Sequence, residues 1–269
     1  GAAAADGASS NPDPSPSSSP IASPNPSPSP DPPTGRSEQR LHLRGRSGSL
    51  TAFLPHHVCA FADARYRQVQ RFELERGASL VFLDWLSAGR SGRGERWDFA
   101  AVQSANVVSY GGHVLFNDCL ELRGGDLEAR LHAMEVVGAI CVIGARARAV
   151  TTHLLRIRDR DSFGDVQRRS AKRRRANSAG EATEGEALDW EAWRDRGVLF
   201  SFCELGGDGA TIWDSTSAGD DGANVDEHGL YVLRFAAPTM PLAYAFVRFC
   251  LAPLEAEIGL QPFSTCRPT

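Results

Sequence analysis

The stretch that decides the fold runs from Ala78 to Val108 and reads ASLVFLDWLSAGRSGRGERWDFAAVQSANVV. It begins with a mostly apolar run and then turns through a segment rich in glycine and arginine. It ends within a second run, from Trp97 to Tyr110. The first run fits either a buried strand or a short helix, because periodicity alone does not separate the two. The second run favours a strand, since it is rich in Val and aromatic side chains.

Outward from this stretch the chain is mostly strand-like. Residues 65–75 alternate between apolar and polar side chains with one imperfect step, which predicts a half-buried strand. The apolar set of that strand is Tyr66, Val69, Phe72 and Leu74. Other apolar or β-branched runs predict further strands over 134–144, 197–205 and 230–237, and a short apolar segment at 50–54 is stopped by Pro55.

Two local signals connect these elements. Gly111 and Gly112 separate two β-rich runs, and both can adopt positive φ, so the pair predicts a hairpin. Pro241 suits the first turn of a helix, and apolar residues follow it at helical spacing. A regular alternation of strands and helices is not seen. The sequence therefore predicts a mainly β fold with one or two helices near its C-terminus.

The chain is expected to have one folded domain preceded by a segment without structure. Residues 1–48 are predicted to be disordered and Pro/Ser-rich, because the run from Ser9 to Pro33 has almost no large apolar side chain to bury. Residues 49–269 are predicted to form the β domain. Disordered insertions are expected within it at 159–187 and 206–229, which are polar or rich in Gly, Asp and Ser.

The composition restricts the class of protein. The 269 residues contain no run of about 18 consecutive apolar side chains, which excludes a transmembrane helix. A net charge of −4 argues against a protein that coats nucleic acid. The six cysteines form no CxxC pair, so reduced thiols are expected, and no secretory signal is visible. A cytoplasmic location is the consistent prediction.

Motifs for nucleotide binding, zinc hydrolysis and the hydrolase nucleophile elbow are absent from the sequence. The first candidate is instead Asp84, which lies inside the apolar run between Leu83 and Trp85. An ionised carboxylate is costly there unless it is paired, and Arg90 is its natural partner. Such a pair fits either a structural role in the turn or a functional site.

The second candidate is Asp118. It shares strand parity with Leu120 and Leu122 and therefore can face the interior, whereas Glu121 points to the opposite face. Two interpretations remain open from the residues alone. In the first, Asp118 faces inward and binds a metal ion or lines a water channel. In the second, it is a solvated strand residue.

Two further features are weaker. His56, His57 and Cys59 are residue types that bind Ni²⁺ or Zn²⁺, but neighbours on one strand diverge, so a complete site needs ligands from elsewhere. A basic run fits either a nucleic-acid patch or a solvated loop; acidic residues follow it and no aromatic residue interleaves with it. The run consists of Arg168, Arg169, Lys172, Arg173, Arg174 and Arg175.

The opening stretch resembles the urease accessory protein UreD family, called UreH in some bacteria. The residues that carry the resemblance are Asp84, Gly89, Arg90, Gly94, Glu95 and Trp97. Flanking segments of the family are also similar to LPHHVCAFADARYRQ, LFNDCLEL and GLYVLRFAAPTMPLAYAFVRFCLAPL. The resemblance covers about residues 50–145 and 197–255. The family's N-terminal Gly-Gly-x-x-x-Gly-Asp segment has no counterpart, so the chain is expected to correspond to the C-terminal part of the family fold.

The resemblance implies a fold of stacked β-sheets resembling a β-helix, with two helices. It also implies a non-enzymatic protein that binds apo-urease with UreF-like and UreG-like partners and helps to deliver nickel. In that family nickel is thought to move through an internal water-filled passage. Asp84 and Asp118 align with its carboxylates, and Glu95 belongs to the same motif as Arg90. We therefore expect these three carboxylates to contact Ni²⁺ transiently, with no tightly bound cofactor. Weak oxygen ligands suit transit, whereas a Cys/His cage would trap the ion.

Two alternatives of other classes stay open. One is a nuclear or nucleic-acid adaptor built on the basic run 168–175, for which salt-dependent binding is expected. The other is a metal-dependent hydrolase that uses His56, His57 and the carboxylates, against which stands the lack of a spaced ligand motif. Membrane partners are not expected, and the acidity of the chain makes nucleic acid the weaker alternative.

Overall fold

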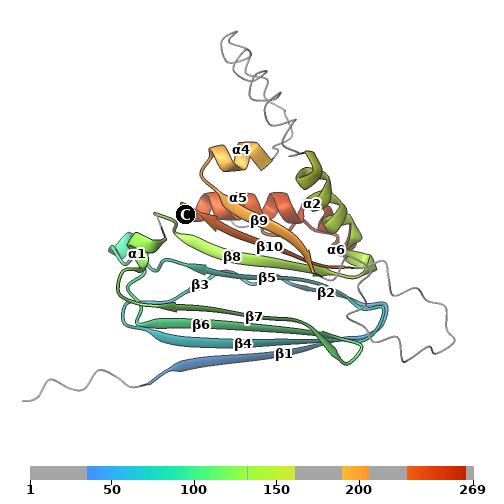
Figure 1. Ribbon diagram of the computed structural model, residues 1–269, viewed down its shortest axis with the longest axis horizontal. Helices are drawn as coiled ribbons and strands as arrows, with labels where there is room; N and C mark the ends of the chain where they lie inside the picture. Colours follow the sequence, from blue (N-terminus) through green and yellow to red (C-terminus); the bar gives the residue numbers. More distant parts are fainter. Residues whose placement is uncertain (1–34, 132, 161–189, 206–228, 265–269) are drawn as a thin grey trace, which may run out of the picture. The chain divides into compact units, whose positions relative to one another are not determined.

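The computed structural model describes residues 35–131, 133–160, 190–205 and 229–264 (Figure 1). The strands of this part of the chain form two sheets, here named sheet A and sheet B. Sheet A contains, in spatial order, β1 (Ser37–Gly45), β4 (Arg65–Leu74), β6 (Ala101–Tyr110) and β7 (His113–Arg123). Sheet B contains β2 (Leu50–Phe53), β5 (Ser79–Ser87), β8 (Val136–Ile143), β10 (Leu230–Ala237) and β9 (Leu199–Leu205), and β3 (Val58–Cys59) also pairs with β5.

The chain passes back and forth between the sheets in its first part. β1, β4 and β6 pair in parallel within sheet A, and β2 and β3 pair in parallel with β5 in sheet B. The remaining pairings, of β7 with β6 and of β8 with β5 and β10, are antiparallel, as is that of β9 with β10. A mainly β fold with two stacked sheets and a helix near the C-terminus is thus confirmed, whereas a β-helix is not.

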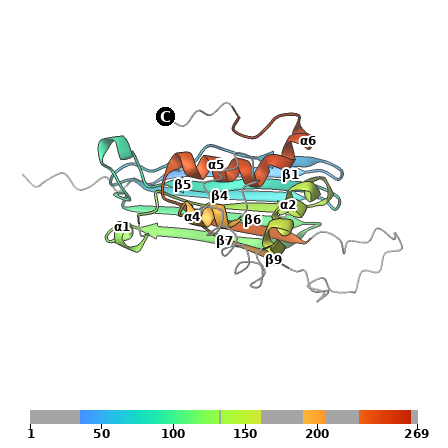
Figure 2. The same cartoon turned by 90° about the horizontal axis from the view of Figure 1, so that it is seen from above.

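Three helices cover the face of sheet B that is turned away from sheet A (Figures 1 and 2). They are α2 (Arg148–Arg160), α4 (Trp190–Asp195) and α5 (Met240–Leu251). The shorter elements are η1 (Ser91–Arg93), α1 (Leu127–Arg130), η2 (Ala145–Ala147), η4 (Ala252–Leu254) and α6 (Glu255–Ile258). None of the helices among the described residues is long and apolar enough to cross a membrane.

The turn between β6 and β7 and the start of helix α5 form as the sequence predicts. Gly111 and Gly112 have φ values of 56° and 90° and join β6 to β7 in the expected hairpin. Thr239 caps α5 by accepting a hydrogen bond from the backbone N–H of Leu242, and Pro241 lies in the first turn. The helix predicted there is confirmed.

The apolar run Ala78–Gly89 forms strand β5, which decides between the two interpretations that periodicity left open. Almost every residue of β5 is buried, because sheet A covers one of its faces and the helices cover the other. A strand buried on both faces has no polar side to alternate with, so its sequence reads as a continuous apolar run. Asp84 is the exception within it.

The predicted start of the folded part is wrong. β1 lies within the segment 1–48 that was expected to be disordered, and pairs in parallel with β4 over its whole length. Ladder hydrogen bonds, the packing of Leu43 and an ion pair between Arg44 and Glu73 order it, and none of these is visible in local composition. Residues 1–34, and the expected insertions apart from their first or last residues, lie outside the described residues.

The cysteines within the described residues are free, as expected for reduced thiols. Cys141 and Cys250 are buried, and this burial raises the pKa of both thiols, so they remain protonated and behave as small apolar side chains. Cys119 and Cys203 are exposed.

Candidate functional site

A belt of polar side chains crosses the space between the sheets at mid-strand. On β5, Leu80 and Phe82 belong to one apolar cluster and Leu86 to another, and Asp84 lies between them. The same sequence of apolar, polar and apolar positions occurs on the strands that face β5. The members of this interior polar belt are Gln68 and Gln70 on β4, Asp84 on β5, and Ser104 and Asn106 on β6.

Asp84 is the centre of the belt. Its Oδ1 accepts a hydrogen bond from Gln68 Nε2 at 2.6 Å. Its Oδ2 accepts one from Ser104 Oγ at 2.5 Å and one from Asn106 Nδ2 at 2.6 Å. All three donors are neutral and come from sheet A, so this carboxylate ties the two sheets together through hydrogen bonds from neutral groups.

No Arg or Lys within the described part of the chain forms an ion pair with Asp84. Ordinarily a carboxylate placed between two apolar clusters is paired with a positive charge, because burial of a charge is costly. The prediction that Arg90 pairs with Asp84 is wrong, since Arg90 binds Glu95 instead. Within the described residues, the carboxylate of Asp84 is therefore held by neutral donors alone.

Two belt oxygens have no hydrogen-bond donor among the described residues. They are Gln70 Oε1 and Asn106 Oδ1, both in side chains at least nine-tenths buried. The orientation of Asn106 follows from chemistry, because a carboxylate only accepts hydrogen bonds and so must face the amide NH₂. Its oxygen then points away from Asp84. Buried acceptors without donors are rare and suit a water molecule or a cation.

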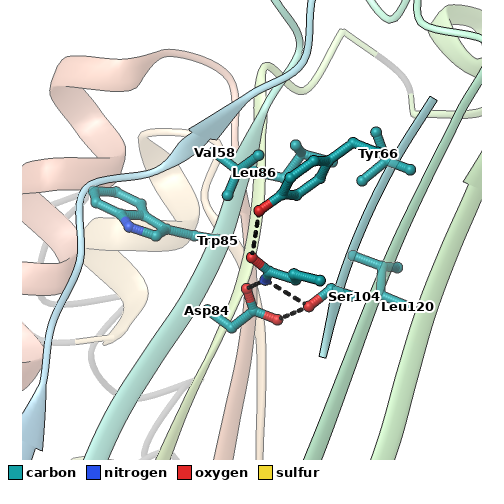
Figure 3. Close-up of a pocket in the computed structure, with 9 residues that line it drawn as sticks. Val58, Tyr66, Asp84, Trp85, Leu86, Ser104 and Leu120 are labelled. Atoms are coloured by element: carbon teal, nitrogen blue, oxygen red, sulfur yellow. Dashed lines mark hydrogen bonds between the residues drawn. The ribbon is translucent and has the colours of Figure 1, made fainter. Parts of the chain in front are cut away.

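A small cavity borders the belt. The volume open to a water-sized sphere is about 20 Å³, which is enough for one water molecule. Figure 3 shows Asp84 and Ser104 at its wall, Tyr66 above them, and Trp85 directed the opposite way, toward the helices. Burial, with the charge of Asp84 nearby, raises the pKa of Tyr66, so its hydroxyl stays protonated and donates to Gln39 Oε1 at 2.8 Å.

Asp118 lies on β7 and points inward, on the face of the strand that it shares with Leu120 and Leu122. It does not line the cavity. Both of its oxygens accept hydrogen bonds from Arg234 on β10, at 2.9 Å each. This bidentate contact connects the last strand of sheet A to sheet B.

Glu95 lies in the loop between β5 and β6 and is also neutralised. Arg90 Nε donates to Glu95 Oε2 at 2.8 Å, and Arg90 Nη2 contacts the other oxygen. These hydrogen bonds lower the pKa of Glu95. Gly89 and Gly94 have φ values of 130° and 75°, where a side chain is strained, which explains both glycines of the motif. Trp97 is buried and donates through Nε1 to the Met134 carbonyl.

The three predicted carboxylates are thus placed in different surroundings, and only Asp84 lies at the cavity. Whether Asp118 or Glu95 ever binds nickel stays a prediction. Within the described residues, no group of three or more His, Cys, Asp or Glu side chains is arranged to hold a metal ion. His56 and His57 instead point their Nδ1 atoms toward the Tyr244 hydroxyl, at 2.7 and 3.4 Å.

Sequence reasoning missed most of the belt. Gln68 and Gln70 were passed over as the polar side of β4, and Val69 was counted with the apolar set, although Val69 lies on the other face of the strand. Strict parity carried the signal. Gln68 and Gln70 are four and two residues before Phe72, and all three side chains therefore lie on the same face of the strand as Leu74. Ser104, Asn106 and Arg234 were not considered. The basic run 168–175, on which the nucleic-acid alternative was built, lies outside the described residues.

Comparison with known proteins gives the class. The family model described as UreD urease accessory protein matches residues 29–267, which is most of the chain. The chain therefore belongs to the UreD urease accessory protein family.

Relatives from several kingdoms are similar to it. Urease accessory protein D of Arabidopsis thaliana is 27% identical over 232 residues, which is 85% of this chain and 70% of that protein. Urease accessory protein UreD of Anaeromyxobacter is 42% identical over 122 residues, or 44% of this chain and 41% of that protein. UreD of Sorangium cellulosum is 37% identical, with 39% of its length covered. The match thus spans about two fifths of these two bacterial relatives.

Proposed function

We propose that this chain is a scaffold and metallochaperone for urease maturation in the cytoplasm. In this proposal it binds apo-urease together with UreF-like and UreG-like partners and helps to deliver Ni²⁺ to the urease active site. It catalyses no reaction itself and holds no cofactor tightly; Ni²⁺ is its cargo. Family membership and the names of the relatives support the maturation role.

The observation that supports nickel delivery is the environment of the Asp84 carboxylate. Its carboxylate accepts three hydrogen bonds from neutral groups, has no cationic partner among the described residues, and lies beside a cavity. A divalent ion that reached the belt would find this charge uncompensated. It would also meet the unused acceptor oxygens of Gln70 and Asn106.

The chemistry of the belt suits transit rather than storage. Amide, hydroxyl and carboxylate oxygens are hard ligands that leave much of the hydration shell of a cation in place, and they bind nickel more weakly than Cys or His would. An ion must be held well enough to enter and weakly enough to leave. In this proposal Asp84 is the carboxylate of the passage, while the paired Asp118 and Glu95 hold elements in position.

The test is complementation. A cell that supplies apo-urease and the other accessory proteins, but lacks its own UreD-type protein, receives the full chain, and urease activity and urease-bound nickel are measured. We expect activation by the unaltered chain, and a loss of about tenfold with Asp84→Asn, the usual scale for a residue that tunes metal binding. Asp126→Asn makes the same change at an exposed carboxylate and should activate normally.

Two results would contradict the proposal. Failure of the unaltered chain to activate urease, although it is present and folded in the cell, removes the maturation role. Normal nickel loading with Asp84→Asn removes the passage role of Asp84 and leaves a docking scaffold. Thermal melting of each variant shows whether a loss of activation reflects unfolding.

A further inference from the structure

The interior polar belt continues beyond the cavity toward one edge of the sheets. In sheet A, Asn106 on β6 is registered directly opposite Asp118 on β7. In sheet B, Asp84 on β5 and Arg234 on β10 are both registered to Ala139 on the strand between them. The Asp118–Arg234 pair therefore lies on the same level of the strands as Asp84 and Asn106, two strands away from Asp84 in sheet B.

This end of the belt faces solvent. The side chain of Arg234 is 50% exposed and that of Asp118 is 21% exposed, whereas Asn106 is 3% exposed. β7 is the last strand of sheet A in the described part of the chain, and on sheet B only β9 extends beyond β10. The pair thus stands where the buried belt meets the outside.

The pairing of Asp118 differs from that of Asp84 in kind. Both oxygens of Asp118 accept hydrogen bonds from one guanidinium, whose positive charge neutralises the carboxylate and opposes the approach of a metal ion. The hydrogen bonds that Arg234 donates to Asp118 also raise the pKa of Arg234. An arginine does not lose its charge in proteins, so the contact persists at any physiological pH.

We propose that Arg234 is a built-in counter-cation that closes this edge of the belt to divalent ions. It occupies the carboxylate of Asp118 and places a fixed positive charge at the opening, so an ion held at Asp84 is repelled from this edge. The inference rests on the proposed function for its meaning in urease maturation. Its physical content, an arginine that masks a metal-binding carboxylate, stands without urease.

The first test measures metal binding alone. The purified full chain and its variants are dialysed to equilibrium against Ni²⁺, and the bound metal is counted by elemental analysis. We expect Arg234→Gln to bind up to one more Ni²⁺ per chain than the unaltered protein, because Asp118 becomes free beside the acceptor oxygen of Asn106. Arg234→Lys keeps the charge and should bind no more than the unaltered protein.

The double variant Arg234→Gln with Asp118→Asn identifies the site. The extra ion should disappear in it. An extra ion that persists would lie elsewhere, and an unchanged nickel count in folded Arg234→Gln would mean that Arg234 masks nothing. Either result overturns the proposal. Arg234 is half exposed, and its replacement should leave the fold intact, which thermal melting of both variants checks.

The second test asks whether Arg234 keeps nickel from being diverted to Asp118 on its way to urease. In the complementation assay Arg234→Gln should lose activation, because nickel is diverted to Asp118, and the added Asp118→Asn change should restore it. A purely structural ion pair would give no such rescue. If Asp118→Asn alone lost as much activation as Asp84→Asn, Asp118 would be a passage ligand and the masking role would be wrong. If the unaltered chain did not activate urease, the proposed function would fail while the dialysis result stood.

Discussion

The face of sheet B beneath the helices is filled with aromatic rings, whereas its other face is interrupted at mid-strand by two glutamines, a serine and an asparagine from sheet A around Asp84. On the helix side, Phe246 of α5 contacts the rings of Trp190 and Trp193. The polar atoms that those two tryptophans bury are single indole N–H groups on large apolar rings. One strand, β5, therefore supplies Trp85 to a dry core and Asp84 to a polar belt.

The aromatic face of sheet B stabilises the fold, whereas the interior polar belt is the candidate for function. Packed aromatic rings contribute stability through the area that they remove from water. Buried amides with unused acceptors do the opposite, because each has lost its hydration without a full replacement. A belt that weakens the fold and is nevertheless lined by a carboxylate is a place to look for function rather than for stability. The two faces should respond to mutation in opposite ways.

The largest effect is expected on the helix side. Phe246→Ala removes a fully buried ring and should lower the free energy of unfolding by about 3–5 kcal/mol. Urea denaturation measures this change. Leu260→Ala, at a side chain that is 58% exposed, is the matched control and should have little effect. The folded fraction of Phe246→Ala should still load nickel in the complementation assay; a nickel defect in that fraction would break the division between the faces.

A smaller effect of the opposite sign is expected in the belt. Gln70 is buried with its Oε1 unpaired, so Gln70→Leu should leave the free energy of unfolding unchanged or raise it by about 1 kcal/mol. At the same time urease activation should fall, since the passage loses an acceptor. Gln103→Leu, on the other face of β6, is the control and should activate normally. Destabilisation by Gln70→Leu would show that the amide has a structural role.

The smallest effect concerns the loop that carries Glu95. The pKa of Glu95 is lowered by its hydrogen bonds from Arg90, so the folded protein favours the ionised form. The resulting stability is present above the ordinary value of 4.5 and is lost as the pH falls through the lower folded value. Thermal melting from about pH 7 to about pH 3 should therefore show a steeper acid loss for the unaltered protein than for Glu95→Gln. Parallel curves would show that the pair adds nothing.

Much of the secondary structure could be predicted from local pattern. The strands over 65–74, 101–110 and 136–143 follow from their residue types, and the hairpin at Gly111 and Gly112 follows from backbone freedom. Asp84 could be singled out because a charge inside an apolar run is unusual at any location. These features depend on residues that are close together in the sequence, and short-range chemistry is sufficient to indicate them.

The partners could not be predicted in this way. Alternation shows which residues of one strand share a face, but it does not show which strands become neighbours. Asp84 receives its donors from β4 and β6, and Asp118 is held by Arg234 from a strand more than a hundred residues later. β1 was assigned to disorder because the contacts that order it, its ladder with β4 among them, join residues that are distant in the sequence.

The sequence by itself determined a mainly β chain with a carboxylate where none is expected. The tertiary structure alone decided that this carboxylate would have no cationic partner among the described residues, while Asp118 would be neutralised by Arg234. The physical reason is that charge compensation acts over a few ångströms in space, and only the packing of distant strands fixes which groups lie within that distance.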